Sequence, residues 1–181
     1  MKKYFLLIAC VLFAMSSQGQ TLTVKESKAM VNGKTSMASY TGASDALEGT
    51  LNLATGEANF KIPLETVKTG NGSRDKDMYK VLEIEEFPYA AFKGKLAEKL
   101  DMEVEQNQKI LVKGTFSIHG VEKPLEVTVD LKPTPDGVMF YTFWPINITD
   151  YGIKRPSVFF IKVEDEHQIV IEGVLIEDES R

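Results

Sequence analysis

Residues 125–132 read Leu-Glu-Val-Thr-Val-Asp-Leu-Lys, so that every second side chain is apolar. Successive side chains of a β-strand point to opposite faces of the sheet, and this alternation therefore indicates a strand with one buried face. The same period of two recurs in Ala58–Leu64, Val112–Ile118 and Trp144–Thr149. A last strand, at about His167–Ile176, is apolar on both faces, so we expect it to be covered on both sides for part of its length.

Turn sequences separate these strands at short intervals. Ala54–Glu57, His119–Pro124 and Pro133–Gly137 each contain a glycine beside other turn-forming residues. Many short antiparallel strands at this spacing are typical of a sandwich or a barrel. The sequence therefore predicts an all-β domain.

One segment, Ser73–Leu82, departs from the alternation. Met78, Val81 and Leu82 recur at the i, i+3, i+4 spacing that places side chains on one face of a helix. Ser73 is expected to cap this helix by accepting a backbone N–H. The preceding glycine-rich stretch, Thr69–Ser73, is interpreted as a turn that enters the helix rather than as an anion site at its N-terminus.

The N-terminus has the pattern of a secretory signal peptide. Lys2 and Lys3 precede the apolar run Tyr4–Met15, and small residues follow before a cut after Gly19. We therefore predict a signal peptide at 1–19, a single domain at 20–181, and a periplasmic or secreted location. Two alternatives are a membrane anchor, for which the run is short of the usual ~20 apolar residues, and a lipoprotein acylated at Cys10.

Charge and cysteine content exclude several classes of function. The chain has a formal net charge of −5, which becomes −7 when Lys2 and Lys3 leave with the signal peptide. Such an acidic protein is a poor candidate for binding nucleic acid or anionic membranes, and we expect no stable membrane span. The single cysteine, Cys10, also lies in the signal peptide, so the mature domain has no disulfide, thiol nucleophile or thiolate metal site.

Catalytic and metal motifs are sparse. The two histidines, His119 and His167, have no closely spaced partners, whereas a zinc site needs three or four convergent ligands. His119 begins a predicted hairpin turn, where a solvated imidazole is expected. No Gly-x-Ser-x-Gly motif is present. We expect no metal, no cofactor and no catalytic residue; the alternative is an enzyme that acts on a small hydrophobic substrate through an acid such as Asp75 or Asp150.

A barrel of about eight strands can be filled by its own side chains or can hold one small ligand. Alternation alone leaves both possibilities open, although the predicted inner face is rich in aromatic residues. A filled barrel would be an interaction scaffold for a partner, whereas an open one would be a binding protein.

Three separated motifs, in order across residues 48–176, resemble those of the YceI-like family of exported lipid-binding proteins. They are Gly70–Asp75 with Met78 and Glu86–Phe92, then Val112–Pro124, and then Ile148–Ile153. The resemblance implies a lipocalin-like antiparallel β-barrel of about eight strands with one short helix, built around an elongated apolar tunnel. It also implies a polyisoprenoid or similar long-chain amphiphile as ligand.

Strand parity and this resemblance together predict which side chains line the tunnel: Phe60, Ile62, Leu64, Met78, Leu82, Phe92, Phe116, Ile118, Val127, Val129, Trp144, Ile146 and Ile148. Arg74 has two interpretations, a local ion pair with Asp75 or a contact with the lipid head group. The expected function is binding of a polyisoprenoid, quinone-like lipid or fatty-acid derivative for periplasmic carriage, storage or stress response. The sequence is also compatible with a homodimer as the oligomeric state.

Overall fold

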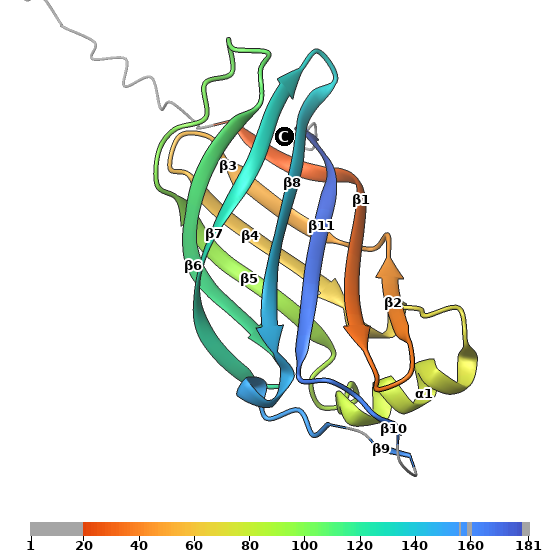
Figure 1. Cartoon of the computed structure of the whole chain (residues 1–181). Helices are drawn as coiled ribbons and strands as arrows, with labels where there is room; N and C mark the ends of the chain where they lie inside the picture. The colour runs from red at the N-terminus through yellow and green to blue at the C-terminus, as the bar shows by residue number, and fades with distance from the viewer. Residues whose placement is uncertain (1–19, 156, 159–160, 179–181) are drawn as a thin grey trace, which may run out of the picture.

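The strands of the protein close into a barrel in the computed structural model, which describes residues 20–155, 157–158 and 161–178 (Figure 1). The predicted signal peptide, residues 1–19, lies outside the described residues. The elements of the barrel wall are β1 (Thr21–Lys34), β2 (Ser39–Ser44), β3 (Glu48–Asn52), β4 (Glu57–Pro63), β5 (Tyr89–Leu96), β6 (Gln108–Ile118), β7 (Val121–Thr134), β8 (Gly137–Asn147) and β11 (Glu166–Glu177).

Antiparallel pairing runs in chain order from β3 to β8, then from β8 to β11, and closes through β11–β1 and β1–β3. Eight of the nine strands thus form the ring. The ninth, β2, pairs with Ala29–Lys34 of β1, on the same edge of β1 that pairs with β3 through Thr21–Thr23. This closed eight-stranded antiparallel barrel with one helix confirms the predicted lipocalin-like fold. Among the described residues, no helix combines the length and apolar character needed to cross a membrane.

Alternation in the sequence becomes alternation in burial. Along β8 the inward positions from Val138 to Ile146 are buried, while Met139, Tyr141 and Phe143 between them are exposed. β11 is apolar on both faces, as expected: Leu175 is 1% exposed and Val170, of the opposite parity, is 9% exposed.

Short helices and tight turns connect the strands at the end of the barrel where β6 meets β7. They are η1 (Leu64–Thr66), η2 (Ile148–Tyr151) and α1 (Gly72–Val81), with the two-stranded β9 (Ser157–Val158) and β10 (Ile161–Lys162) nearby (Figure 1). The β6–β7 turn is shorter than the predicted His119–Pro124. It has only two residues, His119 at φ 54° and Gly120 at φ 72°, as in the type I′ hairpins whose twist matches that of the strands.

The predicted cap of α1 is wrong by two residues. Asn71, not Ser73, is the N-cap, and its side chain accepts from the backbone N–H groups of Ser73 (3.0 Å) and Arg74 (3.1 Å). A capping residue needs extended backbone, which Asn71 has at φ −132°, ψ 107°; Ser73 already lies within the first turn.

The barrel interior has a packed half and an open half. In the packed half, Leu22, Val138 and Leu175 are at most 1% exposed. The ring of Phe92 borders this half and lies over two strand glycines. A Cβ at Gly94 would approach its Cζ to 2.5 Å, and one at Gly114 to 2.7 Å. These two glycines therefore let an aromatic ring lie against the sheet, and the same Phe92 borders the cavity in the other half.

Candidate ligand-binding cavity

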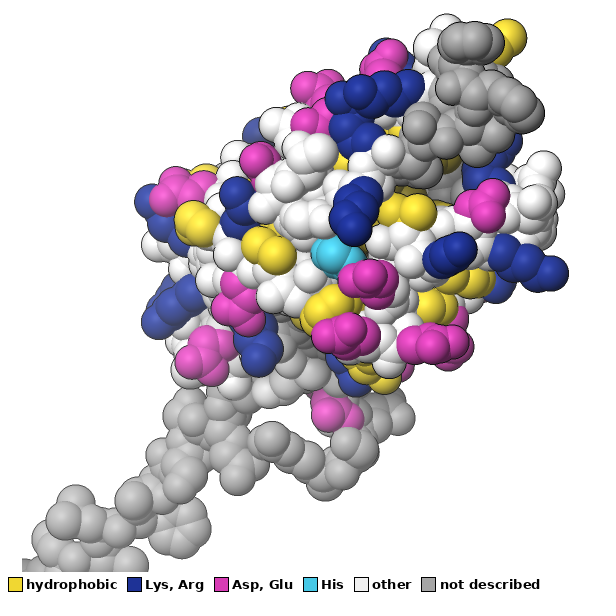
Figure 2. Space-filling model, turned by 90° about the horizontal axis from the view of Figure 1, so that it is seen from below, with side chains coloured by type: hydrophobic (Ala, Val, Ile, Leu, Met, Phe, Trp, Pro, Cys, Tyr) yellow, Lys and Arg dark blue, Asp and Glu magenta, His cyan; other side chains and the backbone are white. Residues whose placement is uncertain are grey.

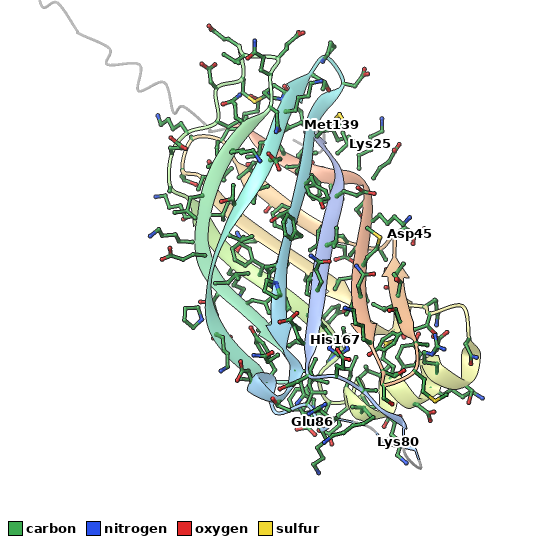
Figure 3. All side chains as sticks on the ribbon, in the orientation of Figure 1. Lys25, Asp45, Lys80, Glu86, Met139 and His167 are labelled. Atoms are coloured by element: carbon green, nitrogen blue, oxygen red, sulfur yellow. The ribbon has the colours of Figure 1, made fainter. Side chains whose placement is uncertain are left out.

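A cavity of about 310 Å³ occupies the open half of the barrel, between the strand ends and α1. Its size falls within the ~300–1,000 Å³ of sites that bind small molecules. Seen from this end, the surface carries hydrophobic side chains between charged ones of both signs (Figure 2). His167, which borders the cavity, lies near this end, whereas Met139 lies near the opposite one (Figure 3).

Eleven of the thirteen predicted tunnel residues border this cavity. They are Phe60, Ile62, Leu64, Met78, Leu82, Phe92, Phe116, Ile118, Trp144, Ile146 and Ile148. The other two do not border it: Val127 belongs to the buried core cluster, and Val129 is partly buried and packs against that cluster. Contact of these residues with a ligand stays a prediction.

The aromatic part of the wall is held by edge-to-face packing. The ring centroid of Phe116 lies 5.5 Å from that of Trp144, at an interplanar angle of 76°. It lies 5.6 Å from that of Tyr151, at 81°. This arrangement is favoured by the ring quadrupoles, and it connects β6, β8 and η2 into one stiff wall.

A buried polar pair, absent from the sequence prediction, also borders the cavity. Tyr40 Oη lies 2.6 Å from His167 Nε2, and His167 Nδ1 lies 3.2 Å from the carbonyl oxygen of Asp165. Because a carbonyl can only accept, Nδ1 donates to the Asp165 carbonyl, and Nε2 forms its hydrogen bond with the Tyr40 hydroxyl. Burial raises the pKa of Tyr40 above its ordinary value, and the nearby Arg74 charge partly offsets that rise. The phenol therefore stays neutral.

Gly33 is the reason that this pair fits against β1. A Cβ at Gly33 would lie 2.5 Å from both His167 Nε2 and Tyr40 Cζ. Three strands, β1, β2 and β11, must therefore come together to create the pair. No motif within one segment indicates it, although a glycine on the inner parity of a strand is a sign of close approach.

Arg74 lies at the rim of the cavity and not in an ion pair with Asp75. Its guanidinium carbon is 5.7 Å from the centroid of the Tyr40 ring, and no carboxylate among the described residues forms a salt bridge with it. The predicted Arg74–Asp75 pair is wrong because Asp75 is buried and turns toward Thr69. There it accepts from the Thr69 backbone N–H (2.8 Å) and hydroxyl (2.6 Å).

His119 is not a solvated turn residue, contrary to the prediction. Its Nε2 lies 2.9 Å from Glu83 Oε2, and its Nδ1 lies 3.1 Å from the Tyr151 carbonyl oxygen. The Phe87 ring packs edge-on at 5.1 Å. The imidazole therefore links Glu83, in the segment after α1, to Tyr151 of η2.

The carboxylates considered for catalysis do not border the cavity. Asp75 is engaged with Thr69, and Asp150 lies 3.9 Å from Lys123 with 53% of its side chain exposed. Within the described part of the chain, no three His, Cys, Asp or Glu side chains are placed to share a metal ion. The wall therefore offers a ligand mainly apolar contact, and its lining includes the charged side chains of Lys61, Arg74 and Asp77.

Comparisons with known proteins agree with this architecture. A sequence model of the YceI-like domain matches residues 20–175. The fold is similar to that of a polyisoprenoid-binding domain from Saccharophagus degradans implicated in plant cell wall breakdown, at 16% identity and a TM-score of 0.67, covering 86% of this chain and 99% of that one.

Two further solved structures share the fold. BcnA from Burkholderia cenocepacia is 17% identical, with a TM-score of 0.67 over 83% of this chain and 96% of its own. The YceI protein of Campylobacter jejuni is 18% identical, with a TM-score of 0.55 over 99% of this chain and 100% of its own. A search of curated proteins finds no match.

Proposed function

Since the chain belongs to the YceI-like family, as its three motifs predicted, we propose that it binds one long-chain lipid inside the barrel. The observation that carries the proposal is the apolar cavity of about 310 Å³ under α1. The polyisoprenoid-binding domain with the same fold supports this class of ligand. Polyisoprenoids, quinone-like lipids and fatty-acid derivatives all have the apolar chain that such a wall accommodates.

The physical basis of the proposed binding is removal of an apolar chain from water. Each buried CH₂ contributes about 0.8 kcal/mol, which corresponds to roughly a fourfold gain in affinity. An apolar wall therefore distinguishes ligands by length and bulk. In a homologous series of saturated fatty acids, affinity should rise by up to this factor per CH₂ and then level off once the cavity is full.

The polar end of the ligand is proposed to lie at the rim beside Arg74. Arg74 borders the cavity and is exposed, its guanidinium carbon lies 5.7 Å from the centroid of the Tyr40 ring, and no carboxylate of the described residues forms a salt bridge with it. A polar or anionic head group placed there keeps its hydration while the chain is buried. Replacing Arg74 with Gln should weaken binding of a fatty acid more than binding of the corresponding alcohol.

We further propose that the protein is exported by its 1–19 signal peptide and carries, stores or senses lipid in the periplasm or outside the cell, including under stress. Binding rather than catalysis is supported by the apolar wall and by the engagement of Asp75 and Asp150 elsewhere.

Extraction of lipid from the purified protein is the direct test. Mass spectrometry should find a long-chain lipid in about stoichiometric amount, and the delipidated protein should take up a fluorescent fatty acid. If the purified protein is free of lipid and takes up neither fatty acids nor isoprenoid alcohols, the proposal is wrong and the barrel is a scaffold.

A further inference from the structure

The cavity ends against a row of aromatic side chains. On four strands, the lining residue farthest from the open end of the barrel is aromatic: Phe60 on β4, Phe92 on β5, Phe116 on β6 and Trp144 on β8. We term these four side chains the aromatic floor. The next residues on the same faces of these strands do not border the cavity; they are Ala58, Gly94, Gly114 and Thr142.

Strand pairing and ring contacts join the aromatic floor across the barrel. Phe92 lies directly opposite Phe60 on one neighbouring strand and opposite Phe116 on the other. Phe116 in turn packs edge-to-face with Trp144. The ring centroid of Phe60 lies 6.1 Å from that of Phe140, which belongs to the buried core cluster and does not border the cavity. The aromatic floor therefore borders the cavity and also packs against the core.

Phe92 lies over a part of the sheet that carries no side chains. The next inward positions of β5 and β6 are Gly94 and Gly114, which are directly opposed in the ladder. A Cβ on either glycine would lie within 2.5 or 2.7 Å of Phe92 Cζ, so the ring itself occupies the space above them. Because Phe92 also borders the cavity, a shorter side chain at this position would join that space to the cavity.

We propose that the aromatic floor limits the length of chain that the barrel accepts, and that Phe92 is the residue that sets this limit. The inference rests on the proposed lipid binding and narrows it to ligands whose buried chain spans the distance from Arg74 at the rim to the floor. The additional CH₂ groups of a longer chain stay in water and add nothing to affinity. A smaller side chain at position 92 therefore lengthens the chain that is accepted.

Saturated fatty acids from decanoic to docosanoic acid, and a parallel series of isoprenoid alcohols, measure this limit in delipidated protein. In wild type, affinity should rise with chain length until the far end of the chain reaches the floor, and then level off. In Phe92→Ala the rise should continue over at least two further CH₂ groups, which is a gain of roughly tenfold. Phe92→Leu leaves a smaller void, so its plateau should shift less.

Phe143→Ala is the matched control. It removes a phenylalanine ring from the outer face of β8, where the side chain is 52% exposed. Its plateau should fall at the same chain length as in wild type. Thermal melts establish that each variant is folded.

The wild-type protein provides a second test, which stands even if the Phe92 variants do not fold. Trp144 is the only tryptophan of the chain and belongs to the aromatic floor, so its fluorescence reports on what lies there. A bromine atom placed at one position along a fatty acid quenches an indole that it approaches closely. Bromine near the methyl end should quench most, and bromine beside the carboxyl group should quench least.

The outcomes separate this inference from the proposed function. The inference is overturned, while lipid binding stands, if Phe92→Ala binds with the wild-type plateau or if Phe143→Ala shifts the plateau equally. It is also overturned if bromine beside the carboxyl group quenches most, because the methyl end then does not reach the floor. If wild type binds neither the fatty acids nor the isoprenoid alcohols, the proposed function itself is wrong.

Discussion

At the scale of single residues, Ile118 distinguishes an open interior from a filled one. Its side chain is 8% exposed and borders the cavity near the end of β6. In a filled core, Ile118→Trp would overpack and cost about 1–3 kcal/mol. Here the indole has open space to enter, so the variant should melt within a few degrees of wild type and lose uptake of a fluorescent fatty acid.

A matched control is Tyr141→Trp, which places an indole on the exposed outer face of β8. It should change neither stability nor uptake. A large loss of stability in Ile118→Trp, with lipid uptake unaffected, would contradict the assignment of this cavity as the lipid site.

Parity correctly places Ile118, Trp144 and the other alternating residues inside the barrel, because facing in or out is a local property of a strand. The expectation of a solvated His119 came instead from its place in a turn, and it is wrong because Glu83 and η2 surround the imidazole. Parity gives no sign of the Tyr40–His167 pair, whose members are 127 positions apart in the sequence.

At the scale of elements, α1 is held beside the cavity by Asp75. The hydroxyl and the backbone N–H of Thr69 each donate a hydrogen bond to the Asp75 carboxylate. These two bonds lower the pKa of Asp75 below its ordinary value of 3.8. The ionised form therefore stabilises the folded state above that value, and this contribution is lost as pH falls through the folded-state pKa.

Asp75→Asn should accordingly be less stable than wild type between about pH 5 and 7, and the difference should shrink below about pH 4 as the wild-type carboxylate becomes protonated. Urea unfolding at a series of pH values measures this. Asp77→Asn, an exposed change on the same helix, is the control. A stability difference that is constant from pH 7 to pH 2.5 would contradict the role given to Asp75.

The helix itself was predictable from the spacing of Met78, Val81 and Leu82, all of which border the cavity. The N-cap residue of the helix was not predictable from the sequence, because Asn71 and Ser73 are both good capping residues. The choice between them depends on where Thr69 and Asp75 fasten the chain to the barrel.

At the scale of the whole molecule, the division into a packed and an open half predicts unequal costs for the same substitution. Ile110 on β6 and Ile146 on β8 are both buried isoleucines, but only Ile146 borders the cavity. Ile110→Ala should cost about 2–5 kcal/mol, as in a close-packed core. Ile146→Ala should cost clearly less in the ligand-free protein, because one side of that residue already faces open space.

Denaturant unfolding of the delipidated variants measures both losses. Adding lipid should stabilise wild type and Ile110→Ala by similar amounts, since a ligand that binds the folded state raises its stability. Equal losses for the two isoleucines would mean that the interior is packed throughout.

The sequence by itself determined the strands β4, β6, β7, β8 and β11 with their inward faces, the position of the helix and, through the family resemblance, the closed barrel. Each of these follows from local periodicity or from short motifs that neighbouring residues carry. Only the tertiary structure decided which half of the barrel is open, which predicted residues border the cavity, and that Tyr40 and His167 pair beside it. The physical reason is that strand parity states which way a side chain points. Whether opposing side chains fill the space between them depends on the volumes and polar groups of residues that meet only across the closed barrel.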